Sequence, residues 1–263
     1  MKRGIVFVLI IAAGLFPASA QNTGAPDAAS IMQAVKERIR SDTMSSRSRM
    51  VITAKNGSTT ERVIDQYSKD DAKGYARTII VFQSPATVKG TRFLMMDNES
   101  GTSDQWIFLP GPGKIRRIAA SEGGGSFMGT DFSYDDMSSL DRDVELDTHS
   151  ISGEERLDET ACYVIQSIPK DKDFLYSKTV SWIDKTNYRV YKREMYDKRG
   201  NLVKVMEVSG YRDIQGRDAP TQTKVSTIAA GTSTTIYMDI VKYDDPVPDG
   251  VFSTAYLETG RLR

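Results

Sequence analysis

The apolar residues change their period once near the start of the chain. Ile31, Val35 and Ile39 recur every four residues, which predicts an amphipathic helix over Ala28–Arg40 because this spacing places them on one helix face. Asp27 precedes the first helical residue and fits an N-cap. Beyond this helix apolar and polar residues alternate, which is the period of β-strands.

Thirteen alternating segments fill most of the remaining chain, and from them about eleven or twelve separate strands are predicted. They lie at Met50–Ala54, Arg62–Tyr67, Ala76–Phe82, Thr91–Met96, Gln105–Leu109, Lys114–Ala119, Ser150–Leu157, Ala161–Pro169, Lys178–Ile183, Arg189–Tyr196, Leu202–Tyr211, Ala219–Ala229 and Thr232–Tyr243. Because almost all connections between them are short, the strands are predicted to form an antiparallel meander. With no internal repeat and no proline-rich linker, residues 28–263 are predicted to form one domain.

The predicted sheet has more apolar surface than the predicted helices can cover. Strands such as Arg189–Tyr196 carry charge along one face, so the sheet has a wet side and an apolar side. Besides the N-terminal helix, only Asp135–Leu140 fits a short helix, and Gly123-Gly124-Gly125 indicates a mobile loop. The pattern therefore favours a mainly β fold, with a strongly curved sheet wrapped around a helix and apolar space left inside.

The first twenty residues are predicted to be a secretory signal peptide. Lys2 and Arg3 precede an apolar run, and Ala18-Ser19-Ala20 predicts cleavage after Ala20. Residues 21–27 are polar and are predicted to be a disordered lead-in. Since the residue directly after the cleavage site is Gln21 and not a cysteine, we expect no lipid anchor at the new N-terminus of the exported chain.

The composition argues against several classes of function. The 35 basic and 35 acidic residues balance, and loss of Lys2 and Arg3 would leave the mature chain slightly acidic, unlike a nucleic-acid binder. Cys162, the only cysteine, is predicted to be buried. His149, the only histidine, has no metal-binding neighbour at helical or strand spacing. Because paired carboxylates and a nucleophile with a base are also absent, we expect no enzyme, no metal and no cofactor.

A set of large apolar residues gathers where the strand pattern breaks down. In a β protein about half of such residues merely fill the core, so core filling is the alternative for each of them. Phe127 and Met128 follow the three glycines and are predicted to form an apolar gate on a loop. The predicted cavity and gate residues are Phe93, Leu94, Met96, Trp106, Phe108, Phe127, Met128 and Phe132.

Arg116 and Arg117 are adjacent on a predicted strand. They form either a solvated strand edge or a contact with an anionic headgroup or an acidic surface of a partner. The residues alone leave both possibilities open.

Four segments in order carry a family resemblance. They read GTRFL at 90–94, QWIFLP at 105–110, KIRRI at 114–118 and SFMGTDFSYDD at 126–136. Together they resemble the LolA-like outer-membrane lipoprotein-sorting family, above all its periplasmic branch often found beside RND-type exporters. The resemblance implies an open, incomplete antiparallel β-barrel of about eleven strands, with helices that plug its concave side.

The resemblance also implies a function. A LolA-like protein is expected to be a monomeric periplasmic carrier or chaperone that binds a lipid, an acylated protein or another apolar ligand. It would pass this ligand between envelope partners such as an RND-type inner-membrane exporter and an outer-membrane acceptor. Carriers of this superfamily use a cavity arginine to hold a helical lid, and Arg92 and Arg116 are the nearest candidates here. Arg92 joins Arg116 and Arg117 as a predicted headgroup or partner contact.

The alternative keeps the fold but not the cargo. On this interpretation the protein has a filled core and docks on an RND-type exporter or a scaffold in the envelope. Ligand binding separates the two functions, because only a carrier needs an apolar cavity that a ligand can enter.

Overall fold

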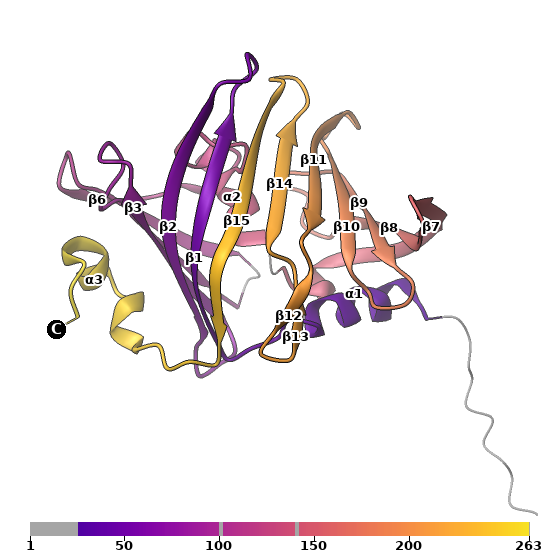
Figure 1. Cartoon of the computed structure of the whole chain (residues 1–263), viewed down its shortest axis with the longest axis horizontal. Coiled ribbons are helices and arrows are strands. Elements are labelled where there is room, and N and C mark those ends of the chain that lie inside the picture. The colour runs from indigo at the N-terminus through magenta and orange to yellow at the C-terminus, as the bar shows by residue number, and fades with distance from the viewer. Residues whose placement is uncertain (1–25, 100–101, 140–141, 263) are drawn as a thin grey trace, which may run out of the picture.

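The alternating residues form one large antiparallel sheet in the computed structural model, which describes residues 26–99, 102–139 and 142–262. The sheet has 13 strands in the order β6-β5-β4-β3-β2-β1-β15-β14-β11-β10-β9-β8-β7, and it curves strongly without closing (Figure 1). Its strands are β1 (Thr43–Thr53), β2 (Thr59–Asp70), β3 (Ala76–Ser84), β4 (Arg92–Asp97), β5 (Ser103–Leu109), β6 (Lys114–Arg117), β7 (Asp147–Leu157), β8 (Thr160–Pro169), β9 (Lys178–Asp184), β10 (Val190–Tyr196), β11 (Leu202–Ser209), β14 (Gln222–Thr227) and β15 (Thr232–Tyr243). A separate hairpin pairs β12 (Arg212–Ile214) with β13 (Arg217–Ala219).

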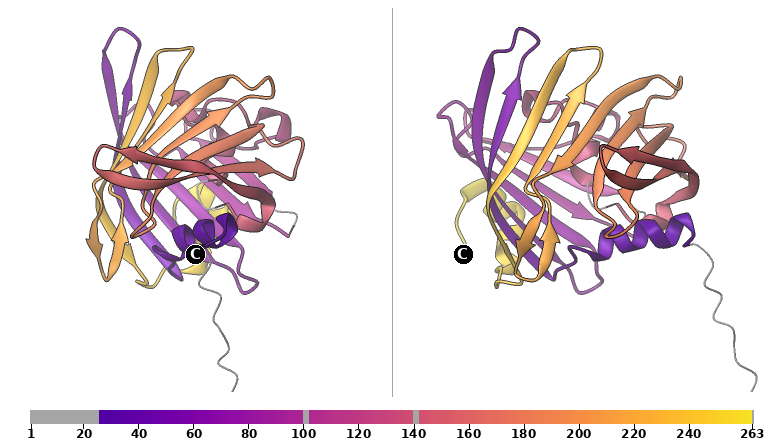
Figure 2. Two further views of the ribbon diagram at one scale, coloured as in Figure 1. Left: turned by 90° about the vertical axis from the view of Figure 1, so that its right-hand side faces the viewer. Right: turned by 45° about the vertical axis from the view of Figure 1, so that its right-hand side comes forward.

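Short helices cover parts of both faces of this sheet. They are α1 (Ala28–Glu37), α2 (Tyr134–Ser139), α3 (Thr254–Thr259) and the 3-10 turns η1 (Ala120–Glu122), η2 (Phe127–Gly129), η3 (Val144–Leu146) and η4 (Asp249–Phe252). Helix α1 lies along the base of the sheet beside β7 to β10 (Figure 2). Helix α3 lies on the convex side, far from α1 (Figure 1).

The predicted fold class is confirmed, and the details differ. The sheet has 13 strands, one in each of the alternating segments named from the sequence, whereas about eleven or twelve separate strands were predicted. Asp27 is the N-cap of α1, accepting from the Ser30 amide at 2.8 Å. The helix ends at Glu37 and not at Arg40, since Arg38 turns toward Asp218 on β13. The predicted signal peptide lies outside the described residues.

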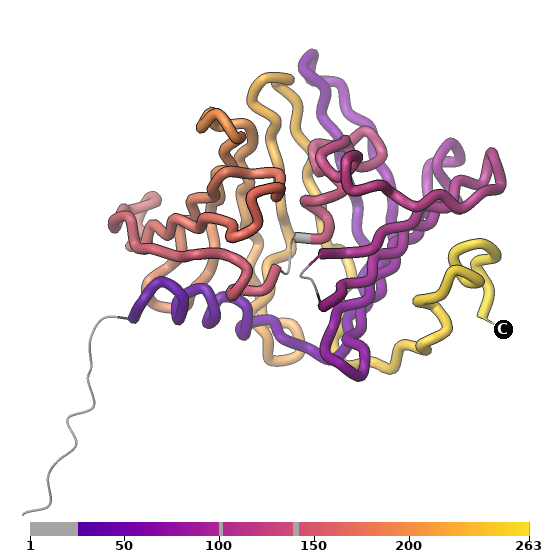
Figure 3. Tube along the Cα trace, turned by 180° about the vertical axis from the view of Figure 1, so that it is seen from behind, coloured from indigo at the N-terminus to yellow at the C-terminus, as the bar shows by residue number. Residues whose placement is uncertain are grey.

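The main core lies on the concave side of the sheet. Residues 118–139, which we call the plug, run from the end of β6 across this side (Figure 3). The plug packs Phe127 and Phe132 against inward-facing residues of β1 to β5, such as Phe82 and Phe93. Phe127 is fully buried and its ring centroid lies 4.9 Å from that of Phe93. The plug therefore fills one half of the concave side.

A second core lies on the convex side of β3 to β5. Ile79, Leu94 and Phe108 pack there beneath Phe252 and Leu257 of the C-terminal segment. Because successive strand residues point to opposite faces, Phe93 and Leu94 belong to different cores.

Candidate functional site: a cavity beneath the N-terminal helix

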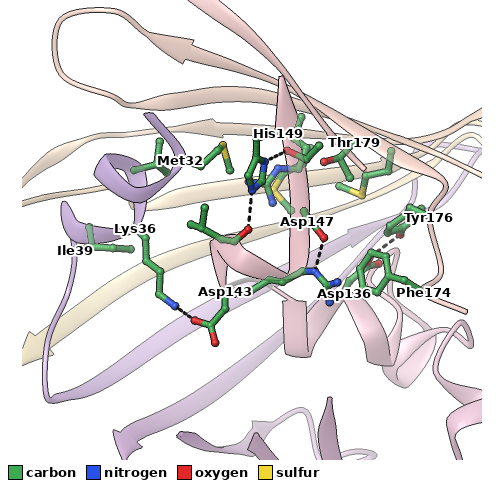
Figure 4. Close-up of a pocket in the computed structure, with 17 residues that line it drawn as sticks. Met32, Lys36, Ile39, Asp136, Asp143, Asp147, His149, Phe174, Tyr176 and Thr179 are labelled. Atoms are coloured by element: carbon green, nitrogen blue, oxygen red, sulfur yellow. Dashed lines mark hydrogen bonds and ion pairs between the residues drawn. The ribbon is translucent and has the colours of Figure 1, made fainter. Parts of the chain in front are cut away.

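A cavity of about 150 Å³ lies between α1 and the concave face of β8 to β11 (Figure 4). The plug covers the other half of the concave side and ends at the border of the cavity. The cavity therefore lies in the half that the plug leaves uncovered. The lining residues are Met32, Val35, Lys36, Ile39, Asp136, Arg142, Asp143, Val144, Asp147, His149, Ser167, Phe174, Tyr176, Thr179, Arg193, Met195 and Met206.

The cavity has an apolar roof and a mixed floor. Met32 and Val35 come from one face of α1, and Ile39 follows just after the helix ends at Glu37. Met195 and Met206 line the opposite side and also belong to the main core. Methionine is flexible enough to adapt to ligands of different shape.

Most charged groups of the cavity are paired. Lys36 Nζ contacts Asp143 Oδ1 at 2.5 Å, and Figure 4 shows this pair beside α1. Arg142 Nε donates to Asp147 Oδ1 at 3.0 Å, and its guanidinium lies 4.1 Å from the centroid of the Phe174 ring. In each pair the positive charge is balanced by the negative charge of its partner.

Asp136 joins the plug to the sheet at the border of the cavity. Lys204 Nζ on β11 lies 2.5 Å from Asp136 Oδ2, and Tyr176 donates its hydroxyl to Oδ1 at 2.6 Å. The Ser133 amide donates to the same carboxylate at 2.7 Å. Burial and the neighbouring Asp136 raise the pKa of Tyr176 well above its ordinary value, so its hydroxyl stays a donor.

Arg193 is the cation of the cavity without a carboxylate partner. Its Nε donates to Ser181 Oγ at 3.1 Å, and its two terminal nitrogens make no hydrogen bond within the described part of the chain. Arg193 lies deep in the fold but keeps part of its accessible surface, because it faces the cavity. Burial lowers the pKa of this guanidinium, against the opposing effect of Asp147.

His149 lines the cavity but both of its ring nitrogens are occupied. Nδ1 lies 2.8 Å from Ser167 Oγ, and Nε2 lies 2.9 Å from the Val144 carbonyl oxygen. These contacts fix η3 against β8. In the described ranges, no group of three or more His, Cys, Asp or Glu side chains could hold a metal ion.

The glycines of the plug allow close packing, which corrects the predicted mobile loop. A Cβ on Gly123 would lie 2.2 Å from an oxygen of Asp135, and one on Gly125 would lie 2.9 Å from the Glu122 carbonyl oxygen. The Tyr134 amide donates to the Gly125 carbonyl at 3.1 Å. The three consecutive glycines therefore allow neighbouring segments of the plug to pack closely against each other.

A buried aspartate fixes the tip of the plug. Asp131 accepts from the hydroxyls of Thr227, Thr232 and Thr234 at 2.6, 2.5 and 2.7 Å. Its own amide donates to Thr234 Oγ1 at 2.9 Å. This network binds the plug to β14 and β15.

The predicted cavity residues are split between the two faces of the sheet. Phe93, Phe127 and Phe132 lie in the concave core, each fully buried, and Met128 packs against them with a positive φ of 52°. The burial of Phe127 favours the core-filling alternative over the predicted apolar gate for this side chain. The predicted residues on the convex side, beneath η4 and α3, are Leu94, Met96, Trp106 and Phe108.

The predicted arginines lie away from the cavity. Arg92 donates to the carbonyl oxygens of Leu257 at 2.6 Å and Glu258 at 2.7 Å, and it lies over the ring of Phe108. It therefore caps the C-terminal end of α3. Arg116 pairs with Glu122 at 2.5 Å, and Arg117 pairs with Asp104, both on exposed surface.

Sequence reasoning missed Arg142 and Arg193, the two arginines that line the cavity. Arg193 stands in a strand rich in charge, so the pattern indicated a wet face. The signal that could have identified it is Met195, which lies two residues further on the same strand face and is buried.

Solved structures of similar proteins share this architecture. A family model described as an uncharacterised protein matches residues 74–259. A crystal structure of a DUF1329 family protein from Desulfovibrio piger is similar, with 30% sequence identity and a TM-score of 0.83 over 87% of this chain and 97% of the other. The chain therefore belongs to the DUF1329 family, and it is LolA-like.

Two further solved structures share the fold. A Vibrio parahaemolyticus domain named for outer-membrane lipoprotein sorting has 25% identity and a TM-score of 0.81, over 88% of this chain and 98% of the other. A LolA superfamily protein from Nitrosomonas europaea has 22% identity and a TM-score of 0.72, over 88% of this chain and 100% of the other. No curated protein matches the chain. Among the described helices, none is long and apolar enough to cross a membrane.

Proposed function

We propose that the protein is a periplasmic carrier that binds an apolar chain in the cavity beneath α1 and passes it between envelope partners. The cavity carries this proposal, because its roof is the apolar face of a short helix and its inner wall includes two methionines. The LolA-like fold and a neighbour named for lipoprotein sorting support it. An RND-type exporter and an outer-membrane acceptor are the partners we expect.

The size of the cavity defines how a chain enters. A volume of about 150 Å³ suits a group about as large as benzene, whereas drug-sized ligands need roughly 300 Å³ or more. A longer chain must therefore move α1 outward or extend through the mouth beside Ile39, which is 39% exposed. Each buried CH₂ contributes about 0.8 kcal/mol, so a few methylenes offset such a movement.

Binding of a neutral apolar probe tests the proposal. Purified mature protein should bind N-phenylnaphthylamine saturably, with a fluorescence increase that phospholipid and fatty acid reverse. Val35→Trp places a large ring in the cavity and should abolish this binding. Gln33→Trp is the matched control, because Gln33 lies on the exposed face of the same helix. Absence of saturable binding by folded wild-type protein would contradict a carrier.

The second candidate is a non-carrier that docks on an exporter or scaffold. One observation favours it: the plug fills half of the concave side with aromatic side chains, so much of the interior holds no space for cargo. If the protein is such a docking protein, Val35→Trp should leave complex formation with envelope partners intact, because the docking surface would lie outside the cavity.

A further inference from the structure

We propose that the ligand of the cavity is a single-chain carboxylate, such as a fatty acid, bound head-inward with its carboxylate on Arg193. This inference rests on the proposed carrier function and names its ligand class. The carboxylate lies at the inner wall and the acyl chain runs past the methionines toward the mouth beside α1.

Arg193 is the one described cation lining the cavity that makes no hydrogen bond or ion pair with a carboxylate. Lys36 and Arg142 each have an acidic partner, as does Lys204 at the border. The one hydrogen-bond partner of the Arg193 side chain is the hydroxyl of Ser181, a residue that is itself fully buried. Asp147 attracts Arg193 but is already bound by Arg142, so the cost of burying the Arg193 cation is only partly offset. An incoming anion would therefore remove an existing penalty and add attraction.

The geometry favours a carboxylate. With Nε occupied by Ser181, the two terminal nitrogens of Arg193 remain as donors, and a guanidinium fork matches the two oxygens of a carboxylate. The acidic groups that face this position are compensated, because Asp147 is held by Arg142 and Asp136 by Lys204. Repulsion of the ligand by these two carboxylates is thus reduced.

The orientation follows from the exposure of the two ends. Arg193 stands next to Met195, which is 3% exposed, whereas Asp143 at the other end has a side chain that is 67% exposed. Only a slender head can pass to the inner end of a cavity of about 150 Å³. A phosphodiester headgroup with two acyl chains is too wide to enter head-first, so the ligand has one chain.

The apolar path supports an extended chain. From Arg193 the tail meets Met206 and Phe174, and then Val35 and Ile39 beside the mouth. A tail that leaves at the mouth can be as long as the ligand requires, because only its first methylenes need to fit inside.

The test compares dodecanoate with methyl dodecanoate, each displacing N-phenylnaphthylamine from the mature protein. The wild type should bind the acid about ten- to a hundredfold more tightly than the ester, the range expected for hydrogen bonds to a charged group. Arg193→Gln should lose this preference and keep the neutral probe. Arg193→Lys should retain part of the preference, since it keeps the charge but not the fork. Arg199→Gln, on an exposed turn, is the matched control and should behave as wild type.

The outcomes separate this inference from the carrier function. Equal affinity of the wild type for acid and ester, with saturable binding of the neutral probe, overturns the carboxylate inference and leaves the carrier standing. Failure of every probe overturns both. If Arg193→Gln does not fold, NMR of carboxyl-labelled dodecanoate on the wild type decides: a carboxylate on Arg193 stays ionised at a pH where the free acid is protonated, and loss of that difference overturns the inference.

Discussion

The two halves of the concave side use the same sheet for different purposes. In the filled half, beneath the plug, β1 to β5 point Met50, Ile80 and Phe93 inward, and all three are fully buried. In the cavity half, beneath α1, the inward residues of β8 to β10 include Ser167, Thr179 and Arg193. The comparison teaches that one curved sheet can serve in two ways, because the inward residues of the first half pack against the plug and those of the second half face a cavity.

The two elements that cover these halves, the plug and α1, are also attached to the sheet in different ways. The plug is fixed by Asp131 and Asp136, both buried and surrounded by donors. Helix α1 is fixed at its end by Arg38, which donates to Asp218 at 2.5 Å, while Arg189 donates to the same carboxylate at 2.7 and 2.9 Å. We call these three residues the Asp218 clamp. Because the clamp lies partly in solvent, α1 is the cover that moves more easily.

Phe127→Ala should break the filled half. Removing a fully buried ring that contacts Phe82 and Phe93 costs about 3–5 kcal/mol, which lowers the melting temperature of a domain this size by about 10 °C. Phe174→Ala is the control in the cavity half and should cost less, since Phe174 is only half-buried. Differential scanning calorimetry checks both. An unchanged melting temperature for Phe127→Ala would instead favour the apolar gate predicted from the sequence.

Lys204→Met should weaken the attachment of the plug. It leaves the buried Asp136 carboxylate with Tyr176 and Ser133 but without its cation, which costs about 3 kcal/mol. Lys224→Met removes an exposed partner of Glu207 and should change stability little. Urea denaturation measures the two free energies of unfolding. Similar values for both variants would show that the border ion pair does not hold the plug.

Asp218→Asn should loosen α1 in a pH-dependent way. The hydrogen bond from Arg189 first, and then Arg38, lower the pKa of Asp218 below its ordinary value. The ionised clamp therefore stabilises the fold fully above about pH 4, and this contribution is lost as pH falls through the lowered pKa. After screening it is worth about 1 kcal/mol, or about 2–4 °C in melting temperature.

Two measurements check the clamp. Melting temperatures of wild type and Asp218→Asn should differ at pH 6 and converge as the pH falls below the lowered pKa of Asp218, where both lack the charge. Hydrogen exchange in α1 should be faster in the variant at neutral pH, while exchange in the plug stays unchanged. Faster exchange in both covers would mean that the two halves of the concave side open together.

The sequence predicts the fold better than the site. Strand alternation and short turns are local, so the antiparallel sheet and α1 could be read from the chain. The residues predicted for the cavity and gate lie in two separate cores, since neighbours such as Phe93 and Leu94 must face opposite sides of the sheet. The residues that cover Leu94, such as Phe252, follow about 150 residues later in a segment without strong periodicity, and only the folded chain brings them together.

The cavity residue Arg193 was missed for a related reason. The register of β10 shifts between Val190 and Lys192, so the face of each following residue does not continue the alternation that precedes it. Lys192 and Glu194 pair with each other at 2.6 Å, and Lys192 lies over the Trp182 ring on the convex side. Arg193 between them faces inward. A charge pattern alone cannot distinguish these neighbours.

Arg116→Gln with Arg117→Gln should have the smallest effect. Both arginines belong to exposed ion pairs on the edge strand β6, and such pairs add little to stability, so the melting temperature should stay within about 2 °C. Neither residue lines the cavity, and dodecanoate should bind the double variant as tightly as the wild type. Vesicles with anionic lipid provide the second measurement. Weaker, salt-sensitive binding of the double variant to these vesicles, with dodecanoate affinity unchanged, would place the pair at a membrane or partner contact outside the cavity. It would also add the edge of the filled half to the functional surface.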